Sequence, residues 1–381
     1  MISLFILGLL LLIFLWNLYY ASHWNRNLTV SLNFVQNYVY AGNQAQMTEQ
    51  IENRKKLMLP VLEVAFHMDR RLTFHDSENT NVSDFVYKRD IFALLGNQRV
   101  IRKLTLDCTK RGYYRVDQSY LTSYSMLHKR RFSVECPADT ELYVYAARTD
   151  VSDIVVDCER LMGSLQCAKR LYEDPFAFSS IREYTVTDPM KTINWKASAR
   201  TGELMVNTFE STLTEKVMIY LDMEDSGILK YEYLVEESIS IASSLAQKLI
   251  ARGMEVGICV NAINDLQTIF LSPAGGKKQL NHIERTLAKC KSDEEVTPFA
   301  EFLSAQSAAH RSPSRQTLYE LSEDLVMIFI SKNTERSQPA IENFVGKSRQ
   351  AIWVIPFTKN DSCSVKTSDN IHLIRREVEK S

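Results

Sequence analysis

The chain has 381 residues, with 45 Lys plus Arg against 46 Asp plus Glu and a formal net charge of −1. Apolar residues make up 45% and charged residues 24%, which are ordinary values for folded protein and exclude a disordered, collagenous or disulfide-stapled chain. Because no basic excess is present, we expect no nucleic acid among the partners. At about 150 residues per domain, the length allows roughly two to three domains.

The chain begins with an uncharged apolar run over residues 2–20, ISLFILGLLLLIFLWNLYY. As a helix it would be about 28 Å long, close to the thickness of a bilayer core. The run lacks the basic start and the small-residue cleavage site of a secretory signal peptide, so we interpret residues 1–24 as a transmembrane anchor. Aromatic residues at its end are expected to mark the membrane–water interface: Trp16, Tyr19, Tyr20 and Trp24.

Two observations bear on the orientation of this anchor. Arg26 is the nearest basic residue behind the run and none precedes it, which favours a cytoplasmic location for the rest of the chain. The seven cysteines form neither a CxxC pair nor a regular framework, as is typical of reduced thiols. We therefore expect a single-pass protein of the cell membrane, with its bulk in the cytoplasm and with other membrane or envelope proteins among its partners.

Residues 28–148 consist of short segments in which apolar and polar residues alternate, such as LTVSLNFV, RVIRKLTLDC and LYVYAA. Polar turns such as Gly42-Asn43 separate these segments. This period of two is typical of an antiparallel, Ig-like β-sandwich. The segment contains no catalytic constellation, so we interpret it as a domain that spaces or presents the next one.

Apolar residues then recur three and four positions apart over 151–173, which predicts an amphipathic helix between two domains. The segment that follows, residues 176–210, has the densest pattern in the chain and is called the box here: FAFSSIREYTVTDPMKTINWKASARTGELMVNTFE. Asp188 followed by Pro189 predicts the start of a helix that stops before Gly202. The residues after Gly202 alternate as in a strand.

The side chains on this predicted helix permit two interpretations. Lys191, Trp195, Lys196 and Arg200 could face an acidic or phosphorylated partner, since Arg and Trp are frequent at protein interfaces. Alternatively, Trp195 is a core residue, and the arginines of the box pair within it. The residues of these internal pairs would be Arg182 and Arg200 with Glu183, Asp188 or Glu210.

The string I-R-E-Y-x-x-x-D-P-x-K-x-I-N-W-K-A-S-A-R-x-G-x-L-M-V-x-x-F-E, from Ile181 to Glu210, resembles the signature of the bacterial and archaeal domain of unknown function family 58. The anchor, the sandwich and the C-terminal part also fit this family. The resemblance implies a von Willebrand factor A-like domain after the box and a membrane-tethered role beside MoxR-type AAA+ ATPases. The candidate partner-binding residues are Arg182, Asp188, Lys191, Trp195, Lys196 and Arg200.

The C-terminal domain, which we assign to residues 149–381 with the box included, alternates apolar strands and amphipathic helices. Examples of strands are KVMIYLDM (216–223), DLVMIFIS (324–331) and QAIWVIPFT (350–358), and a helix is expected over 237–253. This order predicts an α/β domain with a doubly wound, mostly parallel sheet. Ligands of such sheets bind at the carboxyl ends of the strands.

The segment Asp222-Met-Glu-Asp-Ser226 follows the first of these strands, at the place where von Willebrand A domains carry Asp-x-Ser-x-Ser. In that motif, carboxylate and hydroxyl oxygens hold Mg²⁺. Asp222 and Ser226 match the motif, and Glu224 departs from it. The candidate metal ligands are therefore Asp222, Glu224 and Ser226, with Mg²⁺ as the ion. A capped turn without metal is the alternative, because the strand 324–331 supplies no further Asp.

Together these features predict a membrane-anchored, non-enzymatic interaction or adaptor protein. It would work with a MoxR-type AAA+ ATPase in the assembly or maturation of protein complexes. Two alternatives use the loop from Asp222 to Ser226: a metal-assisted hydrolase with Asp222, Glu224 and Asp225 as a carboxylate cluster, and an outward-facing, metal-dependent adhesion receptor. The altered metal motif and the irregular cysteines argue against the receptor.

Overall fold

The computed structural model describes residues 2–76, 80–83, 85–124, 130–170, 178–185, 188, 190–209, 215–225, 230–264, 267–291, 296–311, 325–332, 334–346, 349–359, 365 and 367–378. The chain divides into two compact units. The first comprises Met1–Arg148 together with Glu284–Lys291, and the second comprises Thr149–Ile283 together with Ser292–Ser381.

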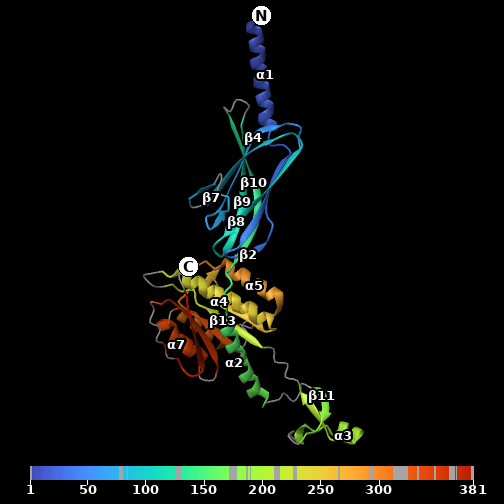
Figure 1. Cartoon of the computed structure of the whole chain (residues 1–381), viewed down its shortest axis with the longest axis vertical. Helices are drawn as coiled ribbons and strands as arrows, with labels where there is room; N and C mark the ends of the chain where they lie inside the picture. Colours follow the sequence, from blue (N-terminus) through green and yellow to red (C-terminus); the bar gives the residue numbers. More distant parts are fainter. Residues whose placement is uncertain are drawn as a thin grey trace. The chain divides into compact units, whose positions relative to one another are not determined.

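The first unit begins with the helix α1 (Ile2–His23), drawn in dark blue in Figure 1. Among the described residues it is the one helix that is long and apolar enough to cross a membrane. Its apolar side chains between Leu4 and Leu18 are largely exposed. A helix of this composition at an N-terminus is either a membrane anchor or a signal sequence.

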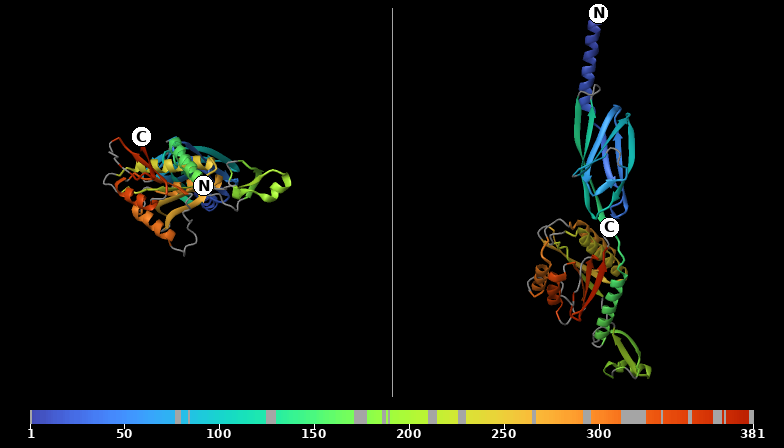
Figure 2. Two further views of the ribbon diagram at one scale, coloured as in Figure 1. Left: turned by 90° about the horizontal axis from the view of Figure 1, so that it is seen from below. Right: turned by 60° about the vertical axis from the view of Figure 1, so that its left-hand side comes forward.

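Two antiparallel sheets follow α1 and pack face to face as a sandwich, as the right-hand view of Figure 2 shows. The four-stranded sheet has the order β1 (Leu28–Phe34), β3 (Gln44–Asn53), β8 (Gln98–Cys108), β5 (Leu72–Phe74). The six-stranded sheet has the order β2 (Tyr38–Tyr40), β10 (Arg131–Tyr145), β9 (Gly112–Tyr124), β4 (Leu59–Asp69), β7 (Phe85–Leu94), β6 (Thr80–Val82). The pairing of β2 with β10 is parallel, and the other strand pairs are antiparallel. The predicted β-sandwich is confirmed.

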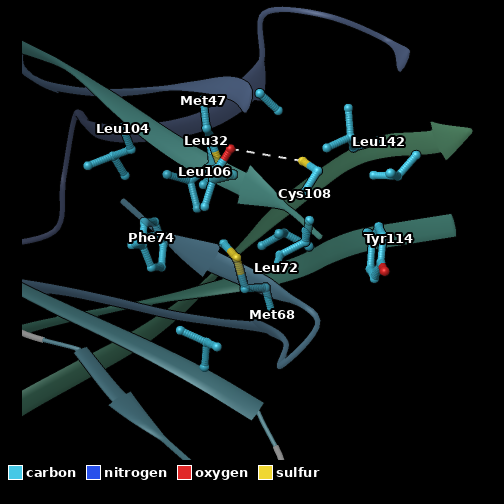
Figure 3. Close-up of a cluster of buried hydrophobic side chains, with 14 of the residues drawn as sticks. Leu32, Met47, Met68, Leu72, Phe74, Leu104, Leu106, Cys108, Tyr114 and Leu142 are labelled. Carbon is cyan, nitrogen blue, oxygen red and sulfur yellow. Dashed lines mark hydrogen bonds between the residues drawn. The ribbon is translucent and has the colours of Figure 1, made fainter. Parts of the chain in front are cut away.

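The period of two in the sequence places every second side chain between the sheets. In β3, for example, burial alternates along almost the whole strand. Figure 3 shows side chains from both sheets in the resulting core, with Leu32, Met47 and Leu106 from the four-stranded sheet. Met68, Tyr114 and Leu142 come from the six-stranded sheet. Burial of this apolar area is the main stabilising term of the unit.

The end of α1 belongs to a second cluster of this sandwich core. Tyr20 and Trp24 are only 5% and 4% exposed. They pack against side chains of both sheets: Ile51, Leu59, Leu62, Val64, Leu94 and Leu121. The expectation that all four aromatic residues at this end lie in the membrane interface is therefore wrong for Tyr20 and Trp24, whereas Trp16 and Tyr19 are exposed. The amphipathic character of Tyr and Trp suits both environments, so the sequence could not separate them.

The second unit contains a six-stranded sheet of mostly parallel strands. Its order is β15 (Gln267–Ala274), β14 (Glu255–Asn264), β13 (Lys216–Leu221), β16 (Leu325–Ile330), β17 (Ala351–Phe357), β18 (Ile371–Glu377), and only β14 and β15 pair antiparallel. The central strands are buried along almost their whole length, as expected for a sheet with helices on both faces. The predicted α/β fold is confirmed.

The helices around this sheet are α2 (Ser152–Arg170), α4 (Glu232–Ala251), α5 (Gly276–Lys289), α6 (Phe299–Arg311) and α7 (Thr334–Val345). Side chains of α6 and α7, such as Phe302 and Phe344, form one core cluster with Tyr220 and Trp353 of the sheet. Helix α4 contacts β13, β14 and β17, and α2 contacts α4. The residues of α5 from Glu284 onward are assigned to the first unit.

Candidate functional site

The box folds as a small hairpin with a helix inserted between its strands. Strand β11 (Phe178–Glu183) pairs antiparallel with β12 (Met205–Phe209). The connection contains a turn of 3-10 helix, η1 (Met190–Thr192), and the short helix α3 (Trp195–Thr201). Ile193 and Val206 face each other across a bridge and are buried. This small apolar contact holds the connection on the hairpin.

Helix α3 begins later than the sequence predicts. Asn194 is its N-cap, and the Asn194 Oδ1 accepts a hydrogen bond from the Ala197 N–H at 3.0 Å. The helix ends where predicted, at Gly202, whose φ of +81° is the left-handed conformation that glycine adopts at low cost. The predicted helix start at Asp188 is wrong, since the first turn after it is a separate 3-10 helix. Pro189 lies outside the described residues.

Asp188 instead closes the hairpin by an ion pair. Both carboxylate oxygens of Asp188 accept hydrogen bonds from the Arg182 guanidinium, at 2.6 and 2.7 Å. The same carboxylate accepts from the Thr185 N–H at 2.9 Å and from the Thr185 hydroxyl at 2.8 Å. The Arg182 hydrogen bonds, followed by those of Thr185, hold the pKa of Asp188 well below its usual range. One of the internal pairs considered from the sequence, Arg182 with Asp188, is therefore present.

The other candidate residues of the box are exposed to solvent. Trp195 is 67% exposed, so its interpretation as a core residue is wrong. Lys191, Lys196 and Arg200 are exposed as well, and no described carboxylate forms an ion pair with them. Glu210, the acid considered as a partner of Arg200, lies outside the described residues. We call the exposed residues of the connection the hairpin–helix surface: Met190, Lys191, Trp195, Lys196, Arg200 and Leu204.

A second cluster of polar residues lies at the carboxyl end of the sheet of the second unit. The parallel register pairs Leu221 with Val260 of β14 and with Ile330 of β16. The residues that follow these three positions are Asp222, Asn261 and Ser331, so the register alone brings their side chains together. Asp222 is almost completely buried.

Both oxygens of the Asp222 carboxylate accept hydrogen bonds from the protein. Oδ1 accepts from the Asn261 amide at 3.0 Å and from the Glu224 N–H at 2.8 Å. Oδ2 accepts from the Ser331 hydroxyl at 2.6 Å, and that hydroxyl lies 2.9 Å from the hydroxyl of Ser337. Asn261 also accepts from the Met223 N–H at 2.8 Å. These bonds hold the end of β13 against its two neighbours.

The two acidic residues after Asp222 face protein cations. The Lys332 ammonium lies 2.5 Å from Asp225 Oδ1, and the Lys332 side chain is only 7% exposed. Asp225 Oδ2 accepts from the Tyr231 N–H at 2.8 Å, next to the start of α4. Glu224 accepts from the Phe299 N–H at 3.0 Å and lies 3.4 Å from the Arg336 guanidinium. We call these residues the strand-end network: Asp222, Glu224, Asp225, Asn261, Ser331, Lys332, Arg336 and Ser337.

The strand-end network does not fit Mg²⁺. Such an ion needs about six oxygens that converge on one point at about 2.0–2.1 Å. Here the described oxygens of Asp222, Glu224 and Asp225 accept from separate donors, and Lys332 supplies the positive charge. No group of three His, Cys, Asp or Glu residues among those described is arranged to hold a metal ion. Ser226, the third predicted ligand, lies outside the described residues.

Sequence reasoning missed Asn261, Lys332 and Arg336. The sequence shows that no Asp follows the strand 324–331, but it does not show which group faces the acidic residues there instead. The signal was the Ser331-Lys332 pair that directly follows the last residue of β16, Ile330, at the same edge of the sheet as Asp222. A basic residue at that position supplies the charge that a metal ion would otherwise bring. The described contacts are those of a hydrogen-bonded turn, and the metal site with Asp222, Glu224 and Ser226 stays a prediction.

Comparison with known proteins places this part of the chain in a family. Residues 180–337 match the family model described as "Protein of unknown function DUF58". Residues 180–337 belong to the DUF58 family. The match begins in β11 and ends in α7, so the hairpin–helix surface and the strand-end network both lie within the DUF58 segment. The family resemblance of the box is confirmed.

One curated relative is the uncharacterized protein YeaD of Bacillus subtilis strain 168. It is 22% identical over 151 residues, which cover 39% of this chain and 35% of the relative. The chain thus matches about a third of the length of that protein.

Solved structures similar to the chain include a non-cellulosomal cohesin from Archaeoglobus fulgidus, with 12% identity, a TM-score of 0.23 and coverage of 32% of this chain and 92% of the cohesin. A CARDB domain from Pyrococcus furiosus has 13% identity, a TM-score of 0.21 and coverage of 30% of this chain and 93% of that domain. These TM-scores are too low to support an argument about function. The assignment of the first unit as a β-sandwich rests on its own strand order.

Proposed function

We propose that the protein is a membrane-anchored, non-enzymatic interaction protein whose hairpin–helix surface binds a partner protein. The proposed partner is a MoxR-type AAA+ ATPase, and the proposed role is the assembly or maturation of protein complexes at the membrane. The observation that carries the proposal is the exposure of Trp195 together with that of the cations Lys196 and Arg200 on the same short helix. The partner follows from the resemblance of the box to its family.

The exposed apolar side chains support an interface. Trp195, Met190 and Leu204 are all exposed within one small substructure. Single exposed apolar residues are normal on protein surfaces, but Trp and Met are enriched at interfaces and Trp is the residue most often found as a binding hot spot. The buried pair Ile193 and Val206 already forms the apolar contact of the connection, so Trp195 is not needed there.

The charge of this surface indicates the chemistry of the partner. From Met190 to Phe209 the chain carries three cations, Lys191, Lys196 and Arg200, and one acid, Glu203, which gives a formal charge of 3 − 1 = +2. Lys196 and Arg200 are four residues apart in α3 and share a face of the helix. An acidic surface with an apolar pocket for the indole would complement this arrangement.

The strand-end network supports an interaction protein over a hydrolase. Its carboxylates accept hydrogen bonds and ion pairs from their own chain, with Lys332 and Asn261 as the main donors. A metal-assisted hydrolase needs an open coordination position and a bound water. The described residues of the network are instead arranged to join β13, β14 and β16 at their carboxyl ends.

The proposal is tested by binding of the full-length chain, in mild detergent, to the purified MoxR-type ATPase of the same organism. Trp195→Ala and the double variant Lys196→Glu/Arg200→Glu should each weaken binding at least tenfold, about 1.4 kcal/mol or more. Lys277→Glu, at an exposed cation in the first turn of α5, is the matched control and should bind like the wild-type chain. Unchanged binding by both surface variants, or no binding by the wild-type chain, would overturn the proposal.

A further inference from the structure

The end of α1 is joined to the sandwich by side-chain contacts. Tyr20 and Trp24 lie in the sandwich core, and the Tyr20 hydroxyl is 2.7 Å from the Ser123 hydroxyl of β9. Strand β1 starts at Leu28, a few residues after the last turn of the helix. The sandwich therefore lies directly at the membrane surface when α1 is in the bilayer, with no flexible linker between them.

The fold brings a basic loop to this end of the sandwich. Leu28 at the start of β1 pairs with Asn53 at the end of β3. The Arg54 N–H donates to the Asn27 carbonyl oxygen at 3.0 Å, which places Arg54 beside the residues that leave the helix. Lys55 and Lys56 follow in the same loop, and Arg54 and Lys56 are exposed, as is Arg26.

The β9–β10 hairpin adds two more cations at the same end. The ring of Phe132 in β10 stacks on Trp24 with a centroid distance of 6.4 Å, and it lies 6.5 Å from the ring of Tyr20. Arg130 and Arg131 directly precede Phe132 and are exposed. We call the whole set the cation collar: Arg26, Arg54, Lys55, Lys56, Arg130 and Arg131.

Two described acids lie close to cations of the collar, and each of them also pairs with a cation outside it. Glu52 lies 2.9 Å from Arg54, but it also pairs with Arg99 at 3.1 Å. Glu63 is buried and lies 2.8 Å from Arg89, whereas its distance to Arg131 is 4.0 Å. Even with Arg130 left aside, the described cations of the collar therefore outnumber the described acids that pair with them. The Lys55 Nζ atom is buried and has no hydrogen-bond partner among the described residues. A phosphate oxygen at the loop would supply an acceptor for it.

We propose that the cation collar binds the phosphate groups of anionic phospholipids in the leaflet where α1 leaves the bilayer. This inference rests on the membrane anchor of the proposed function. The surface at which α1 emerges is the surface that meets lipid headgroups, and basic residues next to a membrane span attract anionic lipid. A leaflet rich in anionic lipid is the cytoplasmic one, so the collar favours a cytoplasmic location for the sandwich.

The test uses the full-length chain reconstituted in vesicles of phosphatidylcholine and phosphatidylglycerol in equal parts. The protein is extracted in mild detergent, and mass spectrometry measures the ratio of the two lipids that remain bound. The wild-type chain should retain phosphatidylglycerol in several-fold excess over phosphatidylcholine. Arg54→Gln/Lys56→Gln/Arg130→Gln should lower this excess to close to the input ratio.

The matched control is Lys103→Gln/Lys110→Gln/Arg115→Gln, which removes the same charge from parts of β8 and β9 and their connection away from the collar. It should retain lipid like the wild-type chain. A second measurement needs no variant: extraction at high salt should lower the wild-type excess, because salt screens exposed charges.

Three outcomes would overturn the inference in different ways. The first is an equal lipid ratio for the wild-type chain and the collar variant while both proteins resist an alkaline carbonate wash. This result would overturn lipid binding by the collar and leave the membrane anchor in place. Release of the wild-type chain by that wash would overturn the membrane anchor, and with it the collar and the membrane part of the proposed function. If the control variant loses as much of the phosphatidylglycerol excess as the collar variant, the effect is one of general charge. This result would also overturn lipid binding by the collar.

Discussion

The hydroxyl of Tyr20 lies 2.7 Å from the hydroxyl of Ser123, so the last turns of α1 and the strand β9 share a buried hydrogen bond. This bond makes the end of the apolar helix a part of the sandwich core. Removal of the Tyr20 side chain would leave a cavity between the sheets and take away one of the two hydrogen bonds of the Ser123 hydroxyl, which also donates to the Val61 carbonyl oxygen at 3.0 Å. The contact therefore couples the end of the apolar helix to the stability of the sandwich.

Substitution of Tyr20 should destabilise the sandwich. Tyr20→Ala should lower the free energy of unfolding by about 3 kcal/mol, because it empties a buried aromatic site. Tyr20→Phe should cost about 1 kcal/mol, since it removes only the hydrogen bond. Urea unfolding of the full-length chain in detergent, followed by hydrogen exchange of the sandwich amides, measures both values. Trp16→Ala, at an exposed position earlier in α1, is the control, and an equal effect there would contradict the docking of Tyr20.

Lys332 should be essential to the stability of the strand-end network. Lys332→Met leaves the Asp225 carboxylate in a partly buried site without its cation, which should cost about 3 kcal/mol. The double variant Lys332→Met/Asp225→Asn should recover part of this loss, because no uncompensated charge remains. Thermal unfolding of the two single variants and the double variant gives the coupling energy. Additive effects would mean that the two side chains do not interact.

Mg²⁺ should not stabilise the wild-type chain. A ligand that binds only the folded state stabilises it by RT ln(1 + [L]/Kd), so the melting temperature rises with ligand concentration. Because the described carboxylates of the network already face donors of the protein, we expect equal Tm values in Mg²⁺ and in a chelator. A Tm that rises with Mg²⁺ in the wild-type chain and does not rise in Asp222→Asn would contradict this prediction and restore the metal site.

Glu49 should make the stability of the sandwich depend on pH. The side chain is buried, and burial raises its pKa to about 7, although the cation of Arg102 opposes the shift. Arg102 lies 4.0 Å from the carboxylate, and Lys88 and Asp90 of β7 are close to it across the core. Between the ordinary pKa near 4.5 and the folded pKa near 7, the folded state binds more protons than the unfolded state. The free energy of unfolding should therefore fall as pH rises through this window, by ~3 kcal/mol at most, and level off above it.

Glu49→Gln should remove this pH dependence and be more stable than the wild-type chain above the window. Urea unfolding between about pH 4 and pH 8, a range that includes both pKa values, measures the slope. Glu135→Gln, at an exposed position of β10, is the control and should leave the wild-type slope unchanged. The same slope in Glu49→Gln as in the wild-type chain would assign the dependence to another group.

Trp195 and Ile193 should have opposite roles in the box. Trp195→Ala should leave stability within about 0.5 kcal/mol, because the side chain is exposed. Ile193→Ala should loosen the connection by about 2 kcal/mol, since it removes a buried contact with Val206. Hydrogen exchange of the β11 and β12 amides measures this local stability. Faster exchange in Trp195→Ala than in Ile193→Ala would place the indole in the core of the box.

Much of the fold could be predicted because its signals are local. Alternation with a period of two appears in β3 and β8, and buried runs appear in β13 and β16. Gly202 could be identified as the end of α3, since the left-handed conformation favours glycine there. The start of α3 was harder, because Asp188 and Asn194 are both good N-caps and only the ion pair with Arg182 removes Asp188 from that role.

The sequence by itself determined the length of the apolar helix, the β-sandwich and α/β classes, and the family of residues 180–337. Only the tertiary structure decided which residues meet. Lys332 and Asp225 are 107 positions apart, and Tyr20 and Ser123 are 103 positions apart, so no periodic pattern connects them. The reason is physical: hydrophobic periodicity records which face of an element is buried, whereas strand register and packing decide which side chains share that buried space.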